Sequence, residues 1–149
     1  MERASKGIVV DASVAAKWFI PEEDSDKASK ILREYADRRI EIYSPDLLIY
    51  EVANLMRYRP DINGEALAEN MENLFRLQLT LIPPSPDMIS EAAVKAKELN
   101  LSVYDACYVV VAEALAANLV TADGELHEKC IGEGLTLLLK DLDGEWRIQ

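Results

Sequence analysis

The sequence predicts an α/β domain, a three-layer α/β/α sandwich around a central and mostly parallel sheet of about five strands. Short apolar runs alternate along the chain with longer segments that have helical periodicity, which is typical of parallel strands covered by helices on both faces. No linker, internal repeat or low-complexity tract divides residues 1–149. This length suits one domain with its own core, so a single domain is expected.

Five short runs rich in Ile, Leu and Val are predicted to be the strands. Each is bounded by turn residues, and each is too short to be a helix of ordinary length. The predicted strands span residues 6–10, 41–43, 79–82, 118–121 and 135–139.

The segments between these strands have the periodicity of helices. Ser44-Pro45 matches an N-cap followed by a first-turn proline, which predicts that a helix starts there. Asn100 is expected to end another helix in the left-handed conformation. The segment 102–116 is apolar on nearly every face, which indicates a buried central helix. The predicted helices span residues 12–19, 24–39, 44–58, 65–77, 87–99, 102–116 and 124–130.

Composition limits the possible classes of protein. The net charge is 16 − 27 = −11, which argues against loose binding to polyanions. Cys107 and Cys130 are the only cysteines and His127 is the only histidine, so a structural zinc site of four Cys or His ligands is excluded within one chain. The cysteines are expected to be buried, reduced thiols. No secretory signal or membrane-spanning stretch is evident, which predicts a cytoplasmic protein without membrane contact.

Four carboxylates stand out because each lies in an apolar neighbourhood. They are Asp11 in GIVVDASV, Glu51 in LLIYEVANL, Asp105 in SVYDACYVV and Asp123 in LVTADGEL. An acid in such surroundings costs free energy unless it is paired. Asp11 and Asp123 directly follow predicted strands, and ligands of open α/β sheets bind beyond the carboxyl ends of strands.

Each acid also has a purely structural interpretation. Asp11 and Asp123 can be N-caps of the helices that follow them, and Asp105 has the spacing of a capping box with Ser102. Glu51 lies in the middle of a helix, where no cap is needed, and Asn54 shares its face. A solvent-exposed glutamate is the alternative there.

Taken together, the four acids favour a metal site. Two carboxylates about 4 Å apart repel by roughly 4 kcal/mol at an effective dielectric near 20, so a cluster of them requires a neutralising partner. Oxygen-only ligands select hard cations, here one or two Mg²⁺ or Mn²⁺ ions. Ser13 and Thr121 could orient carboxylates or bound water, or could simply cap the backbone.

The motifs VVDASV, EVAN and YDACYVVVAEALAANLVTADGEL resemble the PIN-domain family, most closely its VapC-type toxin ribonucleases. The resemblance covers essentially the whole chain. It implies a small α/β/α sandwich, metal-dependent endonucleolytic cleavage of RNA, a homodimer, and a small antitoxin protein as partner in toxin members.

The resemblance also implies roles for individual residues. Asp11, Glu51, Asp105 and Asp123 match the acidic quartet of the family, which binds metal and carries catalysis. Ser13, Asn54 and Thr121 match polar positions beside it. Where the family commonly has a basic or aromatic residue soon after the last acid, this chain has Gly124-Glu125.

Contacts to RNA are assigned from position alone. Lys17, Arg57 and Arg59 are candidates for binding phosphate, and Tyr58 for stacking on a base. For each of them, an exposed surface residue is the alternative interpretation. Apolar residues on the helices 24–39 and 65–77 are expected to pack mainly in the core, with a subset available to a dimer partner or antitoxin; they are Tyr35, Leu67, Met71, Leu74 and Phe75.

Two other functions remain open from sequence. The first is a PIN-like interaction module that has lost its nuclease activity, although the retention of all four acids weighs against it. The second is an aspartate-based phosphoryl-transfer domain. Asp11-Ala12-Ser13 lacks the second aspartate that a dehalogenase-type phosphatase needs, and the acidic pair and later lysine of a receiver domain are not evident.

Overall fold

A computed structural model describes residues 6–143 and contains a five-stranded sheet in which all strands are parallel. The strand order is β3-β2-β1-β4-β5. The sheet extends from β1 in two directions, through β2 to β3 on one side and through β4 to β5 on the other. The strands are β1 (Lys6–Val10), β2 (Ile40–Pro45), β3 (Thr80–Ile82), β4 (Asn118–Thr121) and β5 (Thr136–Leu138).

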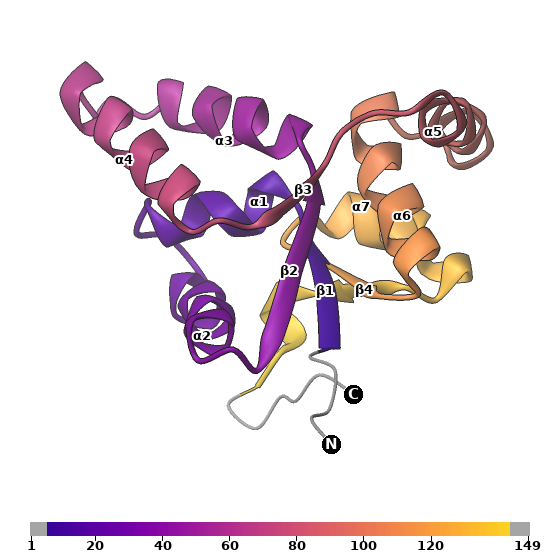
Figure 1. Ribbon diagram of the computed structural model, residues 1–149, viewed down its shortest axis with the longest axis horizontal. Coiled ribbons are helices and arrows are strands. Elements are labelled where there is room, and N and C mark those ends of the chain that lie inside the picture. The colour runs from indigo at the N-terminus through magenta and orange to yellow at the C-terminus, as the bar shows by residue number, and fades with distance from the viewer. Residues whose placement is uncertain (1–5, 144–149) are drawn as a thin grey trace.

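Helices cover both faces of this sheet, which confirms the predicted α/β/α sandwich. Figure 1 shows α2 on one side of β1 and β2, and α5, α6 and α7 on the other. Helices α1 and α3 lie toward the carboxyl ends of these strands. The α-helices are α1 (Ala12–Ala15), α2 (Ser25–Ala36), α3 (Leu47–Arg57), α4 (Gly64–Arg76), α5 (Pro86–Leu99), α6 (Val103–Leu115) and α7 (Gly124–Lys129). Three short 3₁₀ helices are η1 (Ala16–Trp18), η2 (Ile131–Glu133) and η3 (Leu139–Asp141).

Alternation along the central strands divides the core into two layers. Ile8 and Val10 of β1 pack with Ile31 of α2 on one face. Val9 of β1 and Leu119 of β4 belong to the cluster on the other face, which contains α3 and α6. Because successive side chains of a strand point to opposite faces, a β-branched run such as β1 serves both layers at once.

Helix α6 is the buried central helix that the sequence predicts. Seven consecutive residues, 106–112, are buried, and α5 packs against its outer side through Ala92 and Ala96. Ser102 caps α6 by accepting a hydrogen bond from the Asp105 N–H. Asn100 ends α5 with φ 57° and ψ 47°, so the predicted left-handed stop is confirmed.

The predicted start of the third helix is wrong. Ser44 and Pro45 are the last residues of β2, and Asp46 stands at the N-cap position of α3. The Ser44 hydroxyl donates to the Val10 carbonyl oxygen instead of capping a helix. Proline is accepted at the end of the strand, where the short β3 is the neighbour and Asp46 N–H bonds to Ile82 O at 3.0 Å.

The apolar residues predicted to pack in the core mostly do so. Leu74 is fully buried, and Tyr35, Leu67 and Met71 pack partly against the two main clusters. Phe75 is the exception, because 60% of it is exposed. The two cysteines are buried and free, as predicted. Among residues 6–143, no helix has the length and hydropathy needed to span a bilayer.

Candidate active site

The candidate site lies at the topological switch point of the sheet, between the neighbouring strands β1 and β4. β1 and β4 are parallel neighbours, with Val10 paired to Val120, and the chain leaves β1 toward β2 but leaves β4 toward β5. When the connections from two adjacent strands lead to opposite sides of the sheet, a crevice is left beyond the carboxyl ends of those strands. Ligands of α/β sheets bind in such crevices. Asp11 follows β1 at this point, and Asp123 follows β4 two residues after the strand ends.

Two helices supply the other acids. Glu51 lies in the middle of α3, and Asp105 lies in the first turn of α6. Figure 1 shows that α3 and α6 stand on opposite sides of the carboxyl ends of β1 and β2. Asp105 lines the same cleft as Asp11 and Asp123, which follow the strand ends.

All four predicted acids line one open cleft with a volume of about 450 Å³. Segments that are up to 112 residues apart in sequence, from Asp11 to Asp123, contribute to it. Its walls contain carboxylates, a few polar groups and aromatic rings, and no Lys, Arg or His among the residues that the structure describes. The complete lining is Asp11, Ala12, Ser13, Tyr50, Glu51, Asn54, Leu55, Tyr104, Asp105, Tyr108 and Asp123.

Asp11 is the most deeply buried of the acids, with 5% of its surface exposed. Ser13 Oγ donates to Asp11 Oδ1 at 2.5 Å, Thr121 Oγ1 donates to Oδ2 at 2.5 Å, and the Val14 N–H donates to Oδ1 at 3.3 Å. Burial raises the pKa of Asp11 from 3.8 to about 6, although these hydrogen bonds lower it and the charge of Asp105 adds to the rise. Ionising this carboxylate therefore costs more free energy than ionising an aspartate in water, and a nearby cation would offset that cost.

The two hydroxyls that hold Asp11 also join the ends of β1 and β4. Ser13 Oγ accepts from the Ala122 N–H at 2.9 Å, and Thr121 Oγ1 accepts from the Asp123 N–H at 3.0 Å. Thr121 is fully buried beneath the cleft, while Ser13 lines it. Each hydroxyl therefore orients the Asp11 carboxylate and also accepts a hydrogen bond from a backbone N–H, so neither of the two interpretations of Ser13 and Thr121 excludes the other.

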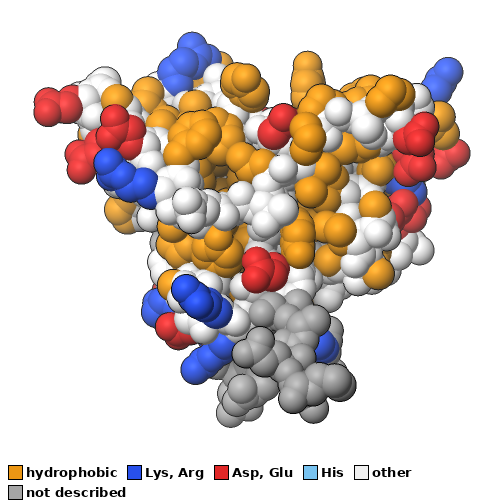
Figure 2. Space-filling model, in the orientation of Figure 1, with side chains coloured by type: hydrophobic (Ala, Val, Ile, Leu, Met, Phe, Trp, Pro, Cys, Tyr) orange, Lys and Arg blue, Asp and Glu red, His pale blue; other side chains and the backbone are white. Residues whose placement is uncertain are grey.

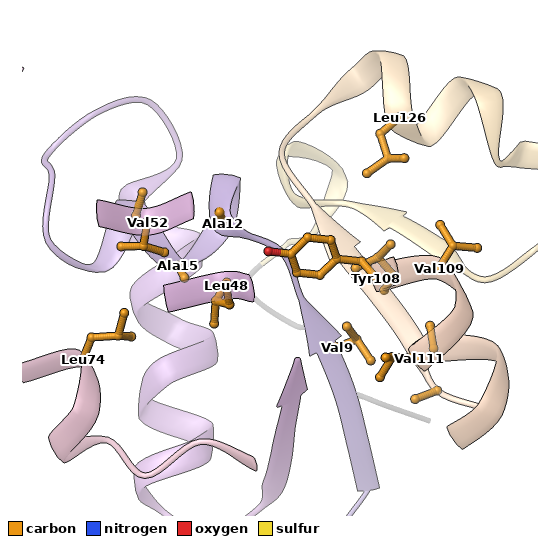
Figure 3. Close-up of a cluster of buried hydrophobic side chains, with 14 of the residues drawn as sticks. Val9, Ala12, Ala15, Leu48, Val52, Leu74, Tyr108, Val109, Val111 and Leu126 are labelled. Carbon is orange, nitrogen blue, oxygen red and sulfur yellow. The ribbon is translucent and has the colours of Figure 1, made fainter. Parts of the chain in front are cut away.

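Glu51 is held by a residue that the sequence analysis did not identify. The Tyr108 hydroxyl donates to Glu51 Oε1 at 2.6 Å, and Figure 3 shows the phenol end of Tyr108 pointing from α6 toward α1 and α3. Burial raises the pKa of Glu51, the Tyr108 hydrogen bond lowers it, and the charge of Asp105 raises it further. Tyr108 follows Asp105 by three residues in an otherwise apolar helix, and this spacing was the available signal.

Asp105 and Asp123 complete the cleft. The pKa of Asp105 is raised by burial first and by the charge of Asp123 second, while Ser102 and Lys129 lower it. Asp123 accepts hydrogen bonds at Oδ1 from the N–H groups of Glu125 and Leu126, at 3.0 and 3.2 Å. Asp11 and Asp123 are thus N-caps as well as residues of the cleft, so the capping interpretation is correct but incomplete.

The donor set suits a hard divalent cation. Carboxylate, hydroxyl and amide oxygens are the ligands that Mg²⁺ and Mn²⁺ take in proteins, and Asn54 adds an amide to the four acids. Within residues 6–143, no three acid, His or Cys side chains are close enough together to enclose an ion as they stand. The carboxylates of Asp11, Glu51 and Asp123 are each held by their own protein donors, so binding an ion would draw the side chains together.

The residues predicted to contact RNA do not line the cleft. Lys17 Nζ is bound to Glu22 Oε1 at 3.2 Å and to the Glu23 carbonyl oxygen at 2.8 Å. The Arg57 guanidinium lies over the ring of Tyr58 at 4.1 Å. Arg59 pairs with Asp61 at 3.0 Å and with Glu22 at 3.7 Å.

The aromatic part of the cleft was not predicted from the sequence. Tyr50 and Tyr104 line the cleft and are 78% and 65% exposed; each directly precedes one of the four acids in the sequence, which was the available signal. His127 is partly buried, and its Nδ1 lies 2.7 Å from Thr136 Oγ1. Thr136 begins β5, so this histidine joins α7 to the edge of the sheet.

Comparison with known proteins gives a consistent result at the level of family. The family model for the PIN domain matches residues 8–131. Ribonuclease VapC3 of Pyrobaculum aerophilum is 35% identical over 126 residues, which cover 82% of this chain and 93% of that protein.

Solved structures agree in fold. The crystal structure of PAE2754 from Pyrobaculum aerophilum has a TM-score of 0.64 at 24% identity and covers 93% of both chains. A toxin–antitoxin complex from Klebsiella pneumoniae has a TM-score of 0.67 at 13% identity, covering 91% of this chain and 99% of that one. VapC20 of Mycobacterium tuberculosis, a toxin that cleaves the sarcin–ricin loop, has a TM-score of 0.62 at 17% identity. The match covers 81% of this chain and 93% of that one. From its sequence match and its fold, the chain belongs to the PIN-domain family and is most like the VapC proteins within it.

Proposed function

We propose that this protein is a metal-dependent endoribonuclease that hydrolyses RNA phosphodiester bonds, and that it is the toxin of a toxin–antitoxin pair. The observation that carries the proposal is the meeting of four carboxylates from four separate segments in one cleft at the switch point of the sheet. The 35% identity to a protein named as a ribonuclease supports the same activity.

The proposed ligands of one or two Mg²⁺ or Mn²⁺ ions are Asp11, Glu51, Asp105 and Asp123. A bound dication supplies a water of lowered pKa and stabilises charge on the leaving oxygen of the phosphate. The buried Asp11, whose pKa is raised to about 6, is the carboxylate that gains most from a neighbouring cation. Ser13 and Thr121 keep both Asp11 oxygens oriented, and the Tyr108 hydroxyl does the same for Glu51.

No histidine is required for this chemistry. The cleft contains no imidazole among the described residues, and His127 is engaged by Thr136. Acid–base work at the phosphate would be carried by water, while the four carboxylates would hold the metal. Asn54 is proposed to hold a water or a phosphate oxygen beside them.

The activity is tested by incubating the purified protein with a mixture of cellular RNA in Mg²⁺, in Mn²⁺ and in EDTA. Cleavage should require the metal and should fall by at least about a hundredfold in Asp11→Asn and in Asp105→Asn, since metal-based charge stabilisation contributes several kcal/mol. Asp37→Asn, at an exposed position after α2, is the matched control and should cleave normally. Metal-independent cleavage, or unchanged cleavage by the two cleft variants, would contradict the proposal.

We further propose that the substrate is RNA, that the protein acts in the cytoplasm, and that a small antitoxin protein binds it. The described neighbour from Klebsiella pneumoniae is a toxin–antitoxin complex of the same fold, and the two free cysteines suit a reducing compartment. Lys17, Arg57 and Tyr58 remain proposed RNA contacts outside the cleft lining. For Lys17 such a contact would require breaking its ion pair with Glu22.

We also propose a homodimer. Figure 2 shows hydrophobic side chains gathered over the middle of the face that carries α4, β3 and α5, with Lys and Arg toward its margins. Beside the edge strand β3, a groove of about 430 Å³ between α5 and α6 is lined mainly by apolar residues. They include Ile82, Pro83, Met88, Val110 and Leu115. An apolar groove at a sheet edge is typical of a surface that a partner covers.

A further inference from the structure

Two exposed tyrosines stand on the rim of the acidic cleft. Tyr50 on α3 is 78% exposed and Tyr104 on α6 is 65% exposed, and both line the cleft. Within residues 6–143 neither ring belongs to a core cluster, and neither side chain has a hydrogen-bond or ion-pair partner. Neither ring is therefore explained by the stability of the fold.

Both tyrosines occupy the same position relative to an acid. Tyr50 directly precedes Glu51, and Tyr104 directly precedes Asp105. Neighbouring residues on a helix are rotated by about 100°, so the acid turns into the cleft while the ring stands at its edge. Because α3 and α6 lie on opposite sides of the strand ends, as Figure 1 shows, the two helices bring one ring each to the cleft.

The charge of the cleft determines what these rings can bind. Its described lining contains four acids and no Lys or Arg, so the wall itself offers an RNA phosphate no cation. The parts of an RNA strand that this wall can hold favourably are the flat faces of unpaired bases. Aromatic rings stack on such bases without regard to their identity.

We propose that Tyr50 and Tyr104 form an aromatic clamp that stacks on unpaired bases next to the phosphate at the acidic centre. This inference rests on the proposed ribonuclease function and assigns two residues that would contact bases of its substrate. The bases of an A-form duplex are stacked on one another and cannot insert between the rings.

The test compares binding of two strands by fluorescence anisotropy of the full-length protein in Ca²⁺, a hard cation that oxygen ligands also bind. One strand is a short labelled oligoadenosine, and the other is an abasic ribose-phosphate strand of equal length and charge. The wild type should prefer the strand with bases by about tenfold or more, as expected for stacking on at least one ring. It should also bind a hairpin stem more weakly than the single strand.

The variants separate stacking from a structural effect. Tyr50→Ala and Tyr104→Ala should lose the preference for bases, whereas Tyr50→Phe and Tyr104→Phe should keep it, because phenylalanine retains the ring. Phe75→Ala is the matched control. Phe75 is also an exposed aromatic residue, on α4, but it does not line the cleft.

The possible results distinguish this inference from the proposed function. If the wild type cleaves and binds RNA but the alanine variants keep its preference for bases, the clamp is wrong and the function stands. The rings would then be a docking site for a protein partner. If the wild type neither binds nor cleaves RNA, the function fails and the clamp fails with it.

Discussion

At the scale of single residues, the central feature is a carboxylate that the fold holds in an unfavourable environment. Asp11 is 5% exposed and receives hydrogen bonds from Ser13, Thr121 and Val14. These donors fix its orientation, but they do not compensate for the loss of hydration, so its pKa rises to about 6. A residue kept in this state at a cost in stability is typical of a binding site.

The pKa of Asp11 predicts how stability depends on pH. An acid with a raised pKa in the folded state stabilises the fold below its unfolded value of 3.8, and this stabilisation is lost as the pH rises through about 6. In EDTA, the free energy of unfolding should fall by about 1.5 kcal/mol from this residue between about pH 5 and about pH 7.5. Asp11→Asn should remove this contribution to the pH dependence of the free energy of unfolding, as measured by urea denaturation. Parallel pH curves for the wild type and the variant would contradict this account of Asp11.

Tyr108 offers a second test at this scale. Tyr108→Phe removes the donor that orients Glu51 and leaves the packing of the ring in place. The affinity for Mn²⁺, measured by calorimetry, should fall by about 10- to 100-fold, as is usual for a residue that positions a metal ligand.

The matched control for Tyr108 is Tyr35→Phe. It removes a hydroxyl that donates to the Leu77 carbonyl oxygen at 2.7 Å, away from the cleft. This variant should lose stability without any change in Mn²⁺ affinity. Equal Mn²⁺ affinity in Tyr108→Phe and the wild type would show that Glu51 needs no such support.

Residue type determined how much of the site was predictable. An acid in an apolar run is visible in a sequence because burial of a charge requires an explanation, and this signal identified Asp11, Glu51, Asp105 and Asp123. For Tyr50, Tyr104 and Tyr108 the signal was only their spacing from an acid, which is weak because tyrosine is common on surfaces and in cores alike. Their positions depend on how α3 and α6 are placed around the cleft, which local sequence does not encode.

At the scale of elements, the N-terminal turn of α6 has two functions. Ser102 caps the helix through the N–H of Asp105, so the same hydrogen bond begins the helix and fixes the backbone of a proposed metal ligand. Ser85 caps α5 in the same way, through the N–H of Met88 at 3.1 Å, but α5 contributes no residue to the acidic cleft.

Removing either of these two caps should cost the same stability, but only one of the two substitutions should affect metal binding. Ser102→Ala and Ser85→Ala should each lower the free energy of unfolding by about 1 kcal/mol, the usual contribution of a serine N-cap. Only Ser102→Ala should also weaken Mn²⁺ binding, because only α6 carries Asp105. Chemical denaturation and calorimetry measure the two effects. If both variants bound Mn²⁺ equally, the cap would have no role in positioning Asp105.

The elements themselves were largely predictable. Strands β1 and β4 match their predicted bounds, and the stop at Asn100 was correct, since these signals are local. Ser44-Pro45 shows where local signals fail. The pair has the composition of a helix start, but pairing of β2 with β3 extends the strand through Pro45 and moves the start of α3 to Leu47. Strand pairing is a tertiary effect, and it overrides the local preference.

At the scale of the whole molecule, the net charge of −11 and the acidic cleft must be reconciled with a polyanionic substrate. The proposed dication would offset part of the charge where the phosphate would lie, and base stacking requires no positive wall. The proposed dimer would leave this cleft open. The apolar groove is lined by residues of α5, α6, the end of β3 and the connection to α5, and none of them lines the acidic cleft.

The groove predicts which surface substitution would disrupt a dimer. Leu115 lines the groove and is 41% exposed, so Leu115→Glu would bury a charge in the interface and should yield a monomer. Ile131→Glu is the control, because Ile131 is 68% exposed and lies outside the groove. Light scattering should give twice the chain mass for the wild type and for Ile131→Glu. A wild-type monomer, or a dimer that survives Leu115→Glu, would contradict the proposed interface.

The most direct test of the whole account is a calorimetric titration of the metal-free protein with Mn²⁺ near neutral pH. We predict saturable binding of one or two ions per chain, which is lost in Asp11→Asn and in Asp105→Asn and is retained in Asp37→Asn. The absence of stoichiometric binding by the wild type, or equal binding by all three variants, would show that the four acids are not a metal site.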